Sequence, residues 1–125
     1  MSKLVINSQA APAAIGPYSQ AIKSGSMVFT SGQIGLDPAS GELVAGFEQQ
    51  VRRAFSNLTA VANQSGGTLA DVVKFTLFLT DLGQFSTVNE IMKEFVPEPF
   101  PARSTVGVAS LPKGAEFEVE AILVI

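Results

Sequence analysis

One arginine near the C-terminus has the surroundings that most suggest chemistry in this 125-residue sequence. Arg103 follows a proline in the stretch PARSTVGVASLP (101–112), and the small and β-branched residues after it predict a strand. A guanidinium keeps its charge at physiological pH, and its planar fork matches a carboxylate. Arg103 could therefore bind a small anionic substrate. The alternative is a structural ion pair with a C-terminal glutamate.

Three carboxylates alternate in the next predicted strand, EFEVEAILVI (116–125). Because strand side chains alternate between faces, Glu116, Glu118 and Glu120 are expected on one face. Such a row is usually solvated. However, the same face continues into apolar residues, which predicts that burial increases along the strand. A carboxylate at that boundary could have a raised pKa or hold a water molecule.

The loop between these two strands decides whether the arginine meets a carboxylate. With a tight hairpin loop, Glu118 would lie about 20 Å from Arg103 along the strand. With a longer loop, Glu118 lies opposite Thr105, on the same face as Arg103. Pro112 cannot donate a ladder hydrogen bond, which favours the longer loop. We therefore expect a long loop near 109–115 and a same-face pair of Arg103 and Glu118.

The absence of cysteine and histidine from the sequence narrows the chemistry further. Disulfides and thiolate chemistry are excluded, and zinc, haem and iron–sulfur sites lose their usual ligands. The spacing of the carboxylates does not match a calcium loop, and no nucleotide-binding glycine motif occurs. A nucleophilic Ser31 would need a lysine as its base, and nothing pairs it convincingly with Lys74. We expect neither a metal nor a cofactor.

Composition indicates a single domain over residues 1–125 and argues against several partners. The net charge is −3 and the basic residues are scattered, whereas nucleic-acid binders usually show a basic stripe. The apolar runs are far shorter than the roughly 18 residues of a membrane span, and a secretory signal is not expected. A cytoplasmic location fits the lack of cysteine. Hydrophobic residues make up 46% and charged residues 15%, which hints at apolar surface buried between subunits.

Hydrophobic periodicity predicts the order β-β-β-α-β-α-β-β. The clearest helix spans 47–67, where Phe47, Val51, Phe55 and Leu58 form one apolar stripe and a Gly-Gly pair provides the stop. The other predicted elements are a strand at 4–7, a hairpin around Gly25-Ser26, a strand at 71–82, a helix at 85–96 and the two final strands. In the 71–82 strand, Val73, Phe75, Leu77 and Leu79 alternate against Lys74, Thr76, Phe78 and Thr80, which predicts that the two sets lie on opposite faces.

These elements predict an α+β fold in which two helices cover one face of a single mixed sheet. The opposite face still carries apolar side chains, namely Phe78, Val106, Ile122 and Val124. Closing several such sheets around a common axis would cover that face.

Two further positions are candidates for a site. Tyr18, the one tyrosine, could donate a hydrogen bond to a ligand or be an ordinary half-buried aromatic residue. Gly32, inside the stretch SGQIG, suggests a bulge or a close approach of the backbone to another group.

Together these stretches resemble the RidA/YjgF family in order and spacing, over essentially the whole chain. The stretches that carry the resemblance are AAIGPYSQAI, FTSGQIGLD, VVKFTLFLTDL, VNE, PARS and ASLPKGAEFEVEAI. The resemblance implies a chorismate-mutase-like fold and a homotrimer with ligand clefts between subunits. It also implies hydrolytic deamination of 2-iminobutanoate and 2-iminopropanoate, the enamine/imine products of pyridoxal-phosphate enzymes, to 2-keto acids.

The resemblance also assigns roles to residues. Arg103 resembles the arginine that holds the substrate carboxylate, and Glu118 resembles the glutamate that positions the attacking water. Further cleft or neighbouring positions are Tyr18, Ser31, Gly32, Asn89, Lys74 and Pro112. Thr105 stands where many members have cysteine, so a thiol-based role is absent and backbone contacts could persist.

Such a site needs no covalent nucleophile, because a protonated imine is already a strong electrophile. Holding the carboxylate and aiming a water can contribute several kcal/mol. Two alternatives remain: a protein that binds or senses small carboxylates or keto acids without turnover, and an endoribonuclease or translation inhibitor. The acidic net charge and the lack of histidine weigh against the last.

Overall fold

The computed structural model describes residues 2–125, which form six strands, two α-helices and three short 3-10 helices. The strands are β1 (Leu4–Ile6), β2 (Ala21–Ser24), β3 (Met27–Thr30), β4 (Val72–Leu79), β5 (Ala102–Gly107) and β6 (Phe117–Val124). The α-helices are α1 (Phe47–Gln64) and α2 (Phe85–Phe95), and the 3-10 helices span Leu69–Asp71, Leu82–Gln84 and Pro112–Gly114. The predicted order of strands and α-helices is confirmed.

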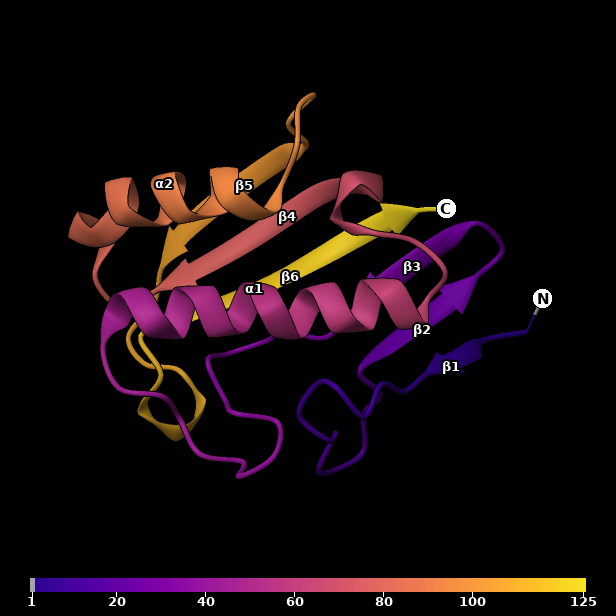
Figure 1. The fold of residues 1–125 in the computed structure, drawn as a ribbon, viewed down its shortest axis with the longest axis horizontal. Helices are drawn as coiled ribbons and strands as arrows, with labels where there is room; N and C mark the ends of the chain where they lie inside the picture. Colours follow the sequence, from indigo (N-terminus) through magenta and orange to yellow (C-terminus); the bar gives the residue numbers. More distant parts are fainter. Residues whose placement is uncertain (1) are drawn as a thin grey trace.

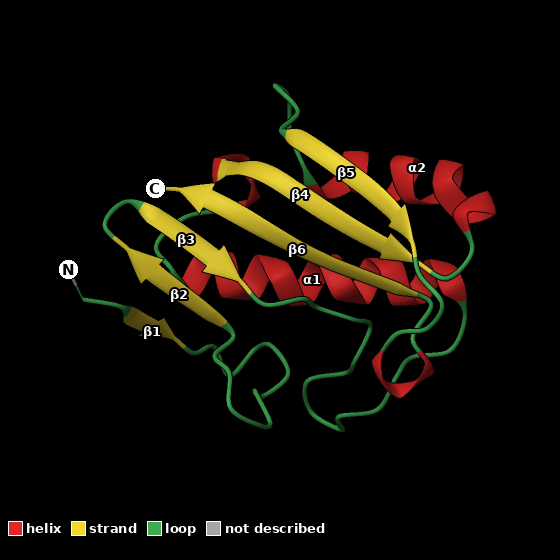
Figure 2. Cartoon of the chain, turned by 180° about the vertical axis from the view of Figure 1, so that it is seen from behind, coloured by secondary structure: helices red, strands yellow, loops and turns green. Residues whose placement is uncertain are grey.

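The strands form one mixed sheet in the order β1-β2-β3-β6-β4-β5. Among the described strands, the β4–β5 pair is parallel and the other neighbours are antiparallel. Both α-helices lie on one face of this sheet (Figure 1). The opposite face of the sheet is covered by no α-helix of the described chain (Figure 2), and we call it the open face. The predicted two-layer α+β architecture is confirmed.

The core lies between α1 and the sheet. Val51, Phe55 and Leu58 are fully buried along the predicted stripe of α1. The Phe55 ring lies 6.0 Å from that of Phe75 on β4 and 5.8 Å from that of Phe117 on β6, measured between centroids. The helix therefore packs on the neighbouring strands β4 and β6, and this contact fixes which face of each strand is buried.

The predicted alternation of faces along β4 is wrong at the start of the strand. The register against β6 shifts between Val72 and Lys74, which is a β-bulge. Val72 is therefore buried and Val73 is 46% exposed, whereas Phe75 and the alternate residues after it point into the core. A bulge adds one residue to a strand and so reverses the faces before it.

The predicted pairing of the two last strands is also wrong. β5 pairs with β4 and not with β6, because β4 lies between them. Glu118 is opposite Phe78 of β4, while Thr105 is next to Leu77. A long loop between β5 and β6 does occur, at residues 108–116, but it carries the chain past β4.

The residues of the two strands explain this arrangement. β6 alternates buried residues with half-buried ones up to its last residue, the exposed Val124, which suits a strand with a neighbour on each side. β5 has no buried residue and ends in a glycine, which suits an edge. Strands that follow one another in sequence usually lie side by side, and this pair is an exception.

Glu116 does not share a face with Glu118 and Glu120. It lies just before β6, and its backbone N–H donates to Gln50 Oε1 of α1 (2.9 Å). Its carboxylate accepts from Gln50 Nε2 (3.4 Å). Glu116 is therefore turned toward the helix layer, and the predicted row of three carboxylates is reduced to two.

The open face carries the predicted apolar residues. Val106 is 39% and Val124 is 44% exposed, and Phe78 and Ile122 are half-buried. Met27 and Phe29 of β3 lie beside Val124 and Ile122 on the same face and are also exposed. Neither α-helix of the described chain is long and apolar enough to cross a membrane.

Candidate active site

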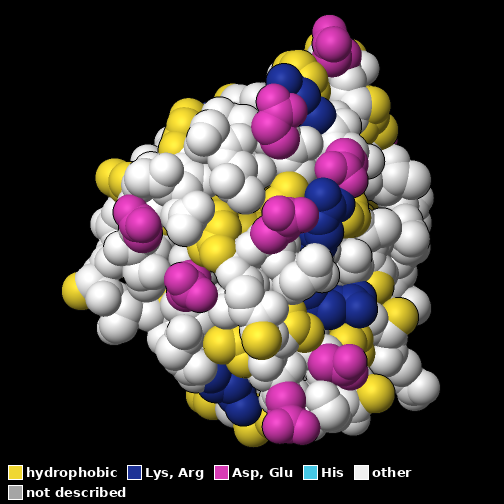
Figure 3. All heavy atoms as spheres, turned by 60° about the vertical axis from the view of Figure 1, so that its left-hand side comes forward, with side chains coloured by type: hydrophobic (Ala, Val, Ile, Leu, Met, Phe, Trp, Pro, Cys, Tyr) yellow, Lys and Arg dark blue, Asp and Glu magenta, His cyan; other side chains and the backbone are white. Residues whose placement is uncertain are grey.

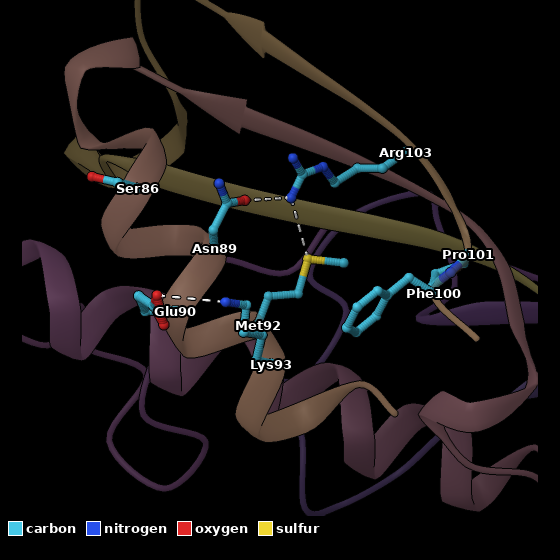
Figure 4. Close-up of a pocket in the computed structure, with 8 residues that line it drawn as sticks. All are labelled: Ser86, Asn89, Glu90, Met92, Lys93, Phe100, Pro101 and Arg103. Carbon is cyan, nitrogen blue, oxygen red and sulfur yellow. Dashed lines mark hydrogen bonds and ion pairs between the residues drawn. The ribbon is translucent and has the colours of Figure 1, made fainter. Parts of the chain in front are cut away.

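Arg103 lies on β5 and points to the helix side of the sheet, because its neighbour Phe75 on β4 is buried there. Its Nη1 donates to Asn89 Oδ1 of α2 (2.7 Å) and lies 3.6 Å from Met92 Sδ (Figure 4). The guanidinium carbon lies 5.0 Å from the centroid of the Phe85 ring, a cation–π contact. Three residues of one helix therefore hold the guanidinium in place.

Arg103 forms none of the ion pairs of the described chain. These pairs join Arg52 to Glu48 and Glu94, and Lys93 to Glu90, near the surface of the helix layer. The structural alternative, an ion pair between Arg103 and a C-terminal glutamate, is therefore wrong within residues 2–125. Because Nη1 already contacts Asn89 and Met92, the other guanidinium nitrogens can donate hydrogen bonds to a carboxylate.

A cavity of about 520 Å³ adjoins Arg103 between α2 and the segment that leads into β5. Asn89 and Met92 form one wall, and Phe100 and Pro101 form the opposite one (Figure 4). Phe100 is 53% exposed, so the cavity opens to solvent on that side. The arrangement puts a held positive charge beside apolar walls, which suits a small organic anion.

Glu118 lies on the open face, on the opposite side of the sheet from Arg103. Burial of the carboxyl raises its pKa, and the nearby negative charge of Glu120 raises it further. A smaller cavity of about 150 Å³ adjoins it, lined among others by Tyr18, Pro112 and Lys113. A carboxylate with a raised pKa is a stronger base than a free one, as proton transfer from a water requires.

Gly32 touches the Glu118 side chain directly. A Cβ atom at this position would overlap the carboxylate, so the backbone comes closer than any other residue would allow. The predicted close approach of the backbone at Gly32 is confirmed.

Ser31 and Tyr18 belong to the same side of the sheet as Glu118. The Ser31 hydroxyl donates to the Ser19 carbonyl oxygen (2.6 Å), and the Ser31 backbone N–H donates to the Gln20 carbonyl oxygen (2.9 Å). Ser31 therefore ties the Tyr18 loop to the end of β3. Tyr18 is 54% exposed and lies at the rim of the small cavity.

Thr105 and Lys74 complete the positions named from the sequence. Thr105 lies two residues after Arg103 and points to the same side, next to Leu77. Its Oγ1 is buried and has no hydrogen-bond partner within the described chain. Lys74 belongs to the open face, where its Nζ donates to Ser104 Oγ (3.1 Å).

The predicted site residues therefore form two groups. Arg103, Asn89 and Thr105 lie on the helix side of β5. Tyr18, Ser31, Gly32 and Glu118 lie around the small cavity of the open face. The expected same-face pair of Arg103 and Glu118 is wrong for a single chain, because their strands are separated by β4 and they point to opposite sides.

The residues that the sequence did not indicate include Phe85 and Met92, which contact Arg103, and Phe100, which lines its cavity. The sequence does contain a signal for Phe85 and Met92. Phe85, Asn89 and Met92 are spaced by four and three residues, so they share one face of the predicted second helix. Phe100 lies in the proline-rich stretch after α2, where no periodicity indicates direction.

Comparisons with known proteins agree with the fold and identify the family of the chain. A family described as endoribonuclease L-PSP matches residues 8–125. The chain is 48% identical to a 2-iminobutanoate/2-iminopropanoate deaminase of Dermatophagoides farinae, covering 98% of this chain and 97% of that protein. Crystal structures of a RidA protein from a Psychrobacter species and of E. coli TdcF with bound serine superpose with TM-scores of 0.95 and 0.92. Their identities are 48% and 44%, and each covers 98% of this chain, with 99% and 98% of those chains matched.

Proposed function

Because the chain belongs to the RidA/YjgF family, we propose that it hydrolyses reactive 2-imino acids to 2-keto acids and ammonia. The proposed substrates are small 2-imino acids such as 2-iminobutanoate and 2-iminopropanoate. The deaminases to which this chain is similar are named after these two compounds. The proposal rests on one observation above all: Arg103 is held by α2, lacks a carboxylate partner in the described chain, and borders an open cavity.

Arg103 binds the substrate carboxylate. Asn89 and Met92 occupy one nitrogen of the guanidinium, and Phe85 stacks against its face, so the fork has little freedom to turn. A bidentate pair with a carboxylate then fixes both the position and the plane of the substrate. Fixing the substrate in this way removes much of the entropic barrier to attack by water.

Glu118 aims the water and takes its proton. The water oxygen bonds to the imine carbon while the electron pair of the C=N bond moves to nitrogen. Glu118 accepts the proton that the water loses, and its raised pKa makes it a base matched to this transfer. Glu118 then returns this proton to the nitrogen. The C–N bond breaks as the hydroxyl oxygen forms the keto group, the hydroxyl proton passes to the Glu118 carboxylate, and ammonia leaves.

We infer further that each site forms between two copies of the chain, within a homotrimer. Arg103 and Glu118 point to opposite sides of one sheet, so one chain cannot place both around one small substrate. A second copy that brings its β5 edge against the open face near Glu118 would complete the site. Tyr18 and Gly32 would then surround the substrate from the Glu118 side.

The open face supports this assembly. Its exposed valine, methionine and phenylalanine side chains form a surface that water covers in an isolated chain. β5 also ends the sheet, which leaves one row of its backbone groups without a strand partner among the described residues. Both features are costly in an isolated chain and useful in an interface.

Imine hydrolysis fits the chain better than RNA cleavage, although the matching family is described by the latter activity. The net charge is −3, which opposes binding to a phosphate backbone. On the face shown in Figure 3, acidic and basic side chains are interspersed and do not gather into a basic patch.

The direct test is the rate of keto acid and ammonia formation from threonine or serine by a pyridoxal-phosphate dehydratase. We expect adding the protein to accelerate release of both products from the imine, and Arg103→Ala to remove the acceleration. Binding of 2-oxobutanoate with no acceleration would instead identify a sensor of small carboxylates, and absence of both would refute the site.

A further inference from the structure

Two buried amide side chains of α1 contact the segments on either side of the Glu118 side chain, residues 34–36 and Glu116. Gln50 is 4% exposed and Asn57 is 0% exposed. They are seven residues apart, which is about two helical turns, so they point to the same side of the helix. Neither lines either of the two cavities described above.

Both N–H groups of the Asn57 amide donate hydrogen bonds to one short segment. Its Nδ2 donates to the Ile34 carbonyl oxygen (3.1 Å) and to the Leu36 carbonyl oxygen (2.9 Å). Its Oδ1 is buried and has no hydrogen-bond partner anywhere in residues 2–125. A buried acceptor without a partner is destabilising, so packing alone would favour a leucine of similar size. The two donated bonds are the physical reason for an asparagine here.

The segment held by Asn57, residues 31–36, forms one wall of the Glu118 cavity. Four of the lining residues belong to it, including Ile34 and Leu36 themselves. Its Gln33 exchanges two backbone hydrogen bonds with Val119 (2.8 and 3.0 Å), directly after Glu118. Its Gly32 leaves no room for a side chain beside the Glu118 carboxylate.

Gln50 holds the chain just before Glu118. Its Oε1 accepts from the Glu116 backbone N–H (2.9 Å), and its Nε2 donates to the Glu116 carboxylate (3.4 Å). Gly35 also presses against the backbone of Gln50, closer than a Cβ would permit. The helix therefore fixes both the chain before Glu118 and the segment that faces it.

We propose that Asn57 and Gln50 are positioning residues for the proposed reaction, because they set the gap between Gly32 and the Glu118 carboxylate. This inference rests on the function proposed above. Neither residue touches the substrate. They act through the backbone of 31–36 and through Glu116, and a small displacement of Glu118 moves the water that it aims. A misplacement of about 1 Å in such a group can cost on the order of a hundredfold in rate.

The test compares buried amides with exposed ones on the same helix. Asn57→Leu and Gln50→Met keep approximate size and remove the hydrogen bonds. Asn63→Leu and Gln49→Met make the same changes at exposed positions of α1. For each variant, kcat and KM for imine hydrolysis, Kd for 2-oxobutanoate and the Tm are measured. The titration of the Glu118 carboxyl is followed by carbon-13 NMR.

We expect Asn57→Leu and Gln50→Met to lower kcat by about tenfold or more with KM changed less than about twofold, because Arg103 still holds the carboxylate. The Glu118 pKa should move down toward its ordinary value, since a looser wall admits water. The charged or titratable groups around Glu118 are Glu120 on its own strand and Lys113 and Tyr18 on the loops, and no variant alters them. The two exposed-site variants should match the wild type.

The outcomes separate the two proposals. If the wild-type protein does not hydrolyse imines, the proposed function fails. The Glu118 titration then still tests whether Asn57 and Gln50 set the gap between Gly32 and the Glu118 carboxylate. If the wild type is active and both buried-site variants keep its kcat and its Glu118 titration, the inference is wrong, even if their Tm values fall. If Asn57→Leu does not fold, Gln50→Met decides by the same two readouts.

Discussion

The Arg103 region and the Glu118 region lie on opposite faces of one sheet and are built in different ways. Arg103 is on an edge strand, beside an open cavity of about 520 Å³, and side chains of α2 hold it. Glu118 is on a central strand, beside a cavity of about 150 Å³, and backbone segments enclose it. The first region is suited to binding a charged ligand, and the second to controlling a proton.

Under the proposed function, one chain carries two separate half-sites. Each half needs a different environment, because a carboxylate-binding arginine must be reachable and a base with a raised pKa must be partly dehydrated. Opposite faces of a sheet supply these environments separately. In the proposed homotrimer, a second copy of the chain brings these two environments together.

The largest effect is expected at Arg103. Arg103→Ala should remove keto acid binding and imine hydrolysis together, with a loss in kcat/KM of at least about a hundredfold, or roughly 2.7 kcal/mol. Arg103→Lys should restore little, because an ammonium cannot form the bidentate pair. Calorimetric titration with 2-oxobutanoate and initial rates measure both. Full activity in the alanine variant would remove Arg103 from the site.

The next effect separates binding from chemistry at Glu118. Glu118→Gln keeps the shape of the side chain and cannot accept a proton. We expect 2-oxobutanoate binding within about twofold of wild type and a kcat lower by about a hundredfold, the range of general base catalysis. A kcat equal to that of the wild type would mean that another group aims the water.

A smaller effect is expected from the aromatic contact to Arg103. Phe85→Leu removes the cation–π interaction and keeps an apolar side chain against the guanidinium. Such contacts contribute about 0.5–1 kcal/mol at partly exposed sites, so the Kd for 2-oxobutanoate should rise about two- to fivefold. Phe47→Leu on α1 is the matched control, because its ring contacts Phe117 in the core and not Arg103. Equal affinity in both variants would contradict a role for the ring.

The smallest effect concerns stability against pH. The Glu118 pKa is raised in the folded chain, so folding favours the protonated form. Its stabilising contribution is full below the ordinary value near 4.5 and is lost as pH rises through the folded pKa. Glu118→Gln should therefore raise the Tm slightly at pH 7 relative to wild type, with the difference shrinking toward pH 4. Calorimetric scans across this range measure it, and a lower Tm for the variant at pH 7 would contradict the burial of this carboxylate.

Much of the fold follows from local patterns in the sequence. The stripe of Val51, Phe55 and Leu58 predicts α1 and its buried side, and the glycines after it predict its end. Alternation predicts β6 with Glu118 on the less buried face. These signals are reliable because period and burial are properties of one element, which does not depend on its neighbours.

The pairing of strands could not be predicted in the same way. The side to which Arg103 points depends on its parallel partner Phe75, almost thirty positions earlier, and not on the strand that follows. The bulge at Val73 depends on the register against β6 and leaves no mark in the alternating pattern. Residue types therefore identified Arg103 and Glu118 as candidates, while their separation on two faces required the sheet order.

The most direct test of the two half-sites is a mixing experiment with two inactive variants. Arg103→Ala keeps Glu118, and Glu118→Gln keeps Arg103. Each is assayed alone, and the two are then mixed by unfolding and refolding together at equal amounts. If each site takes Arg103 from one copy and Glu118 from another, chance pairing makes about a quarter of the sites intact, so about a quarter of wild-type activity should return. Activity no higher than the mean of the two separate variants would contradict a site shared between copies.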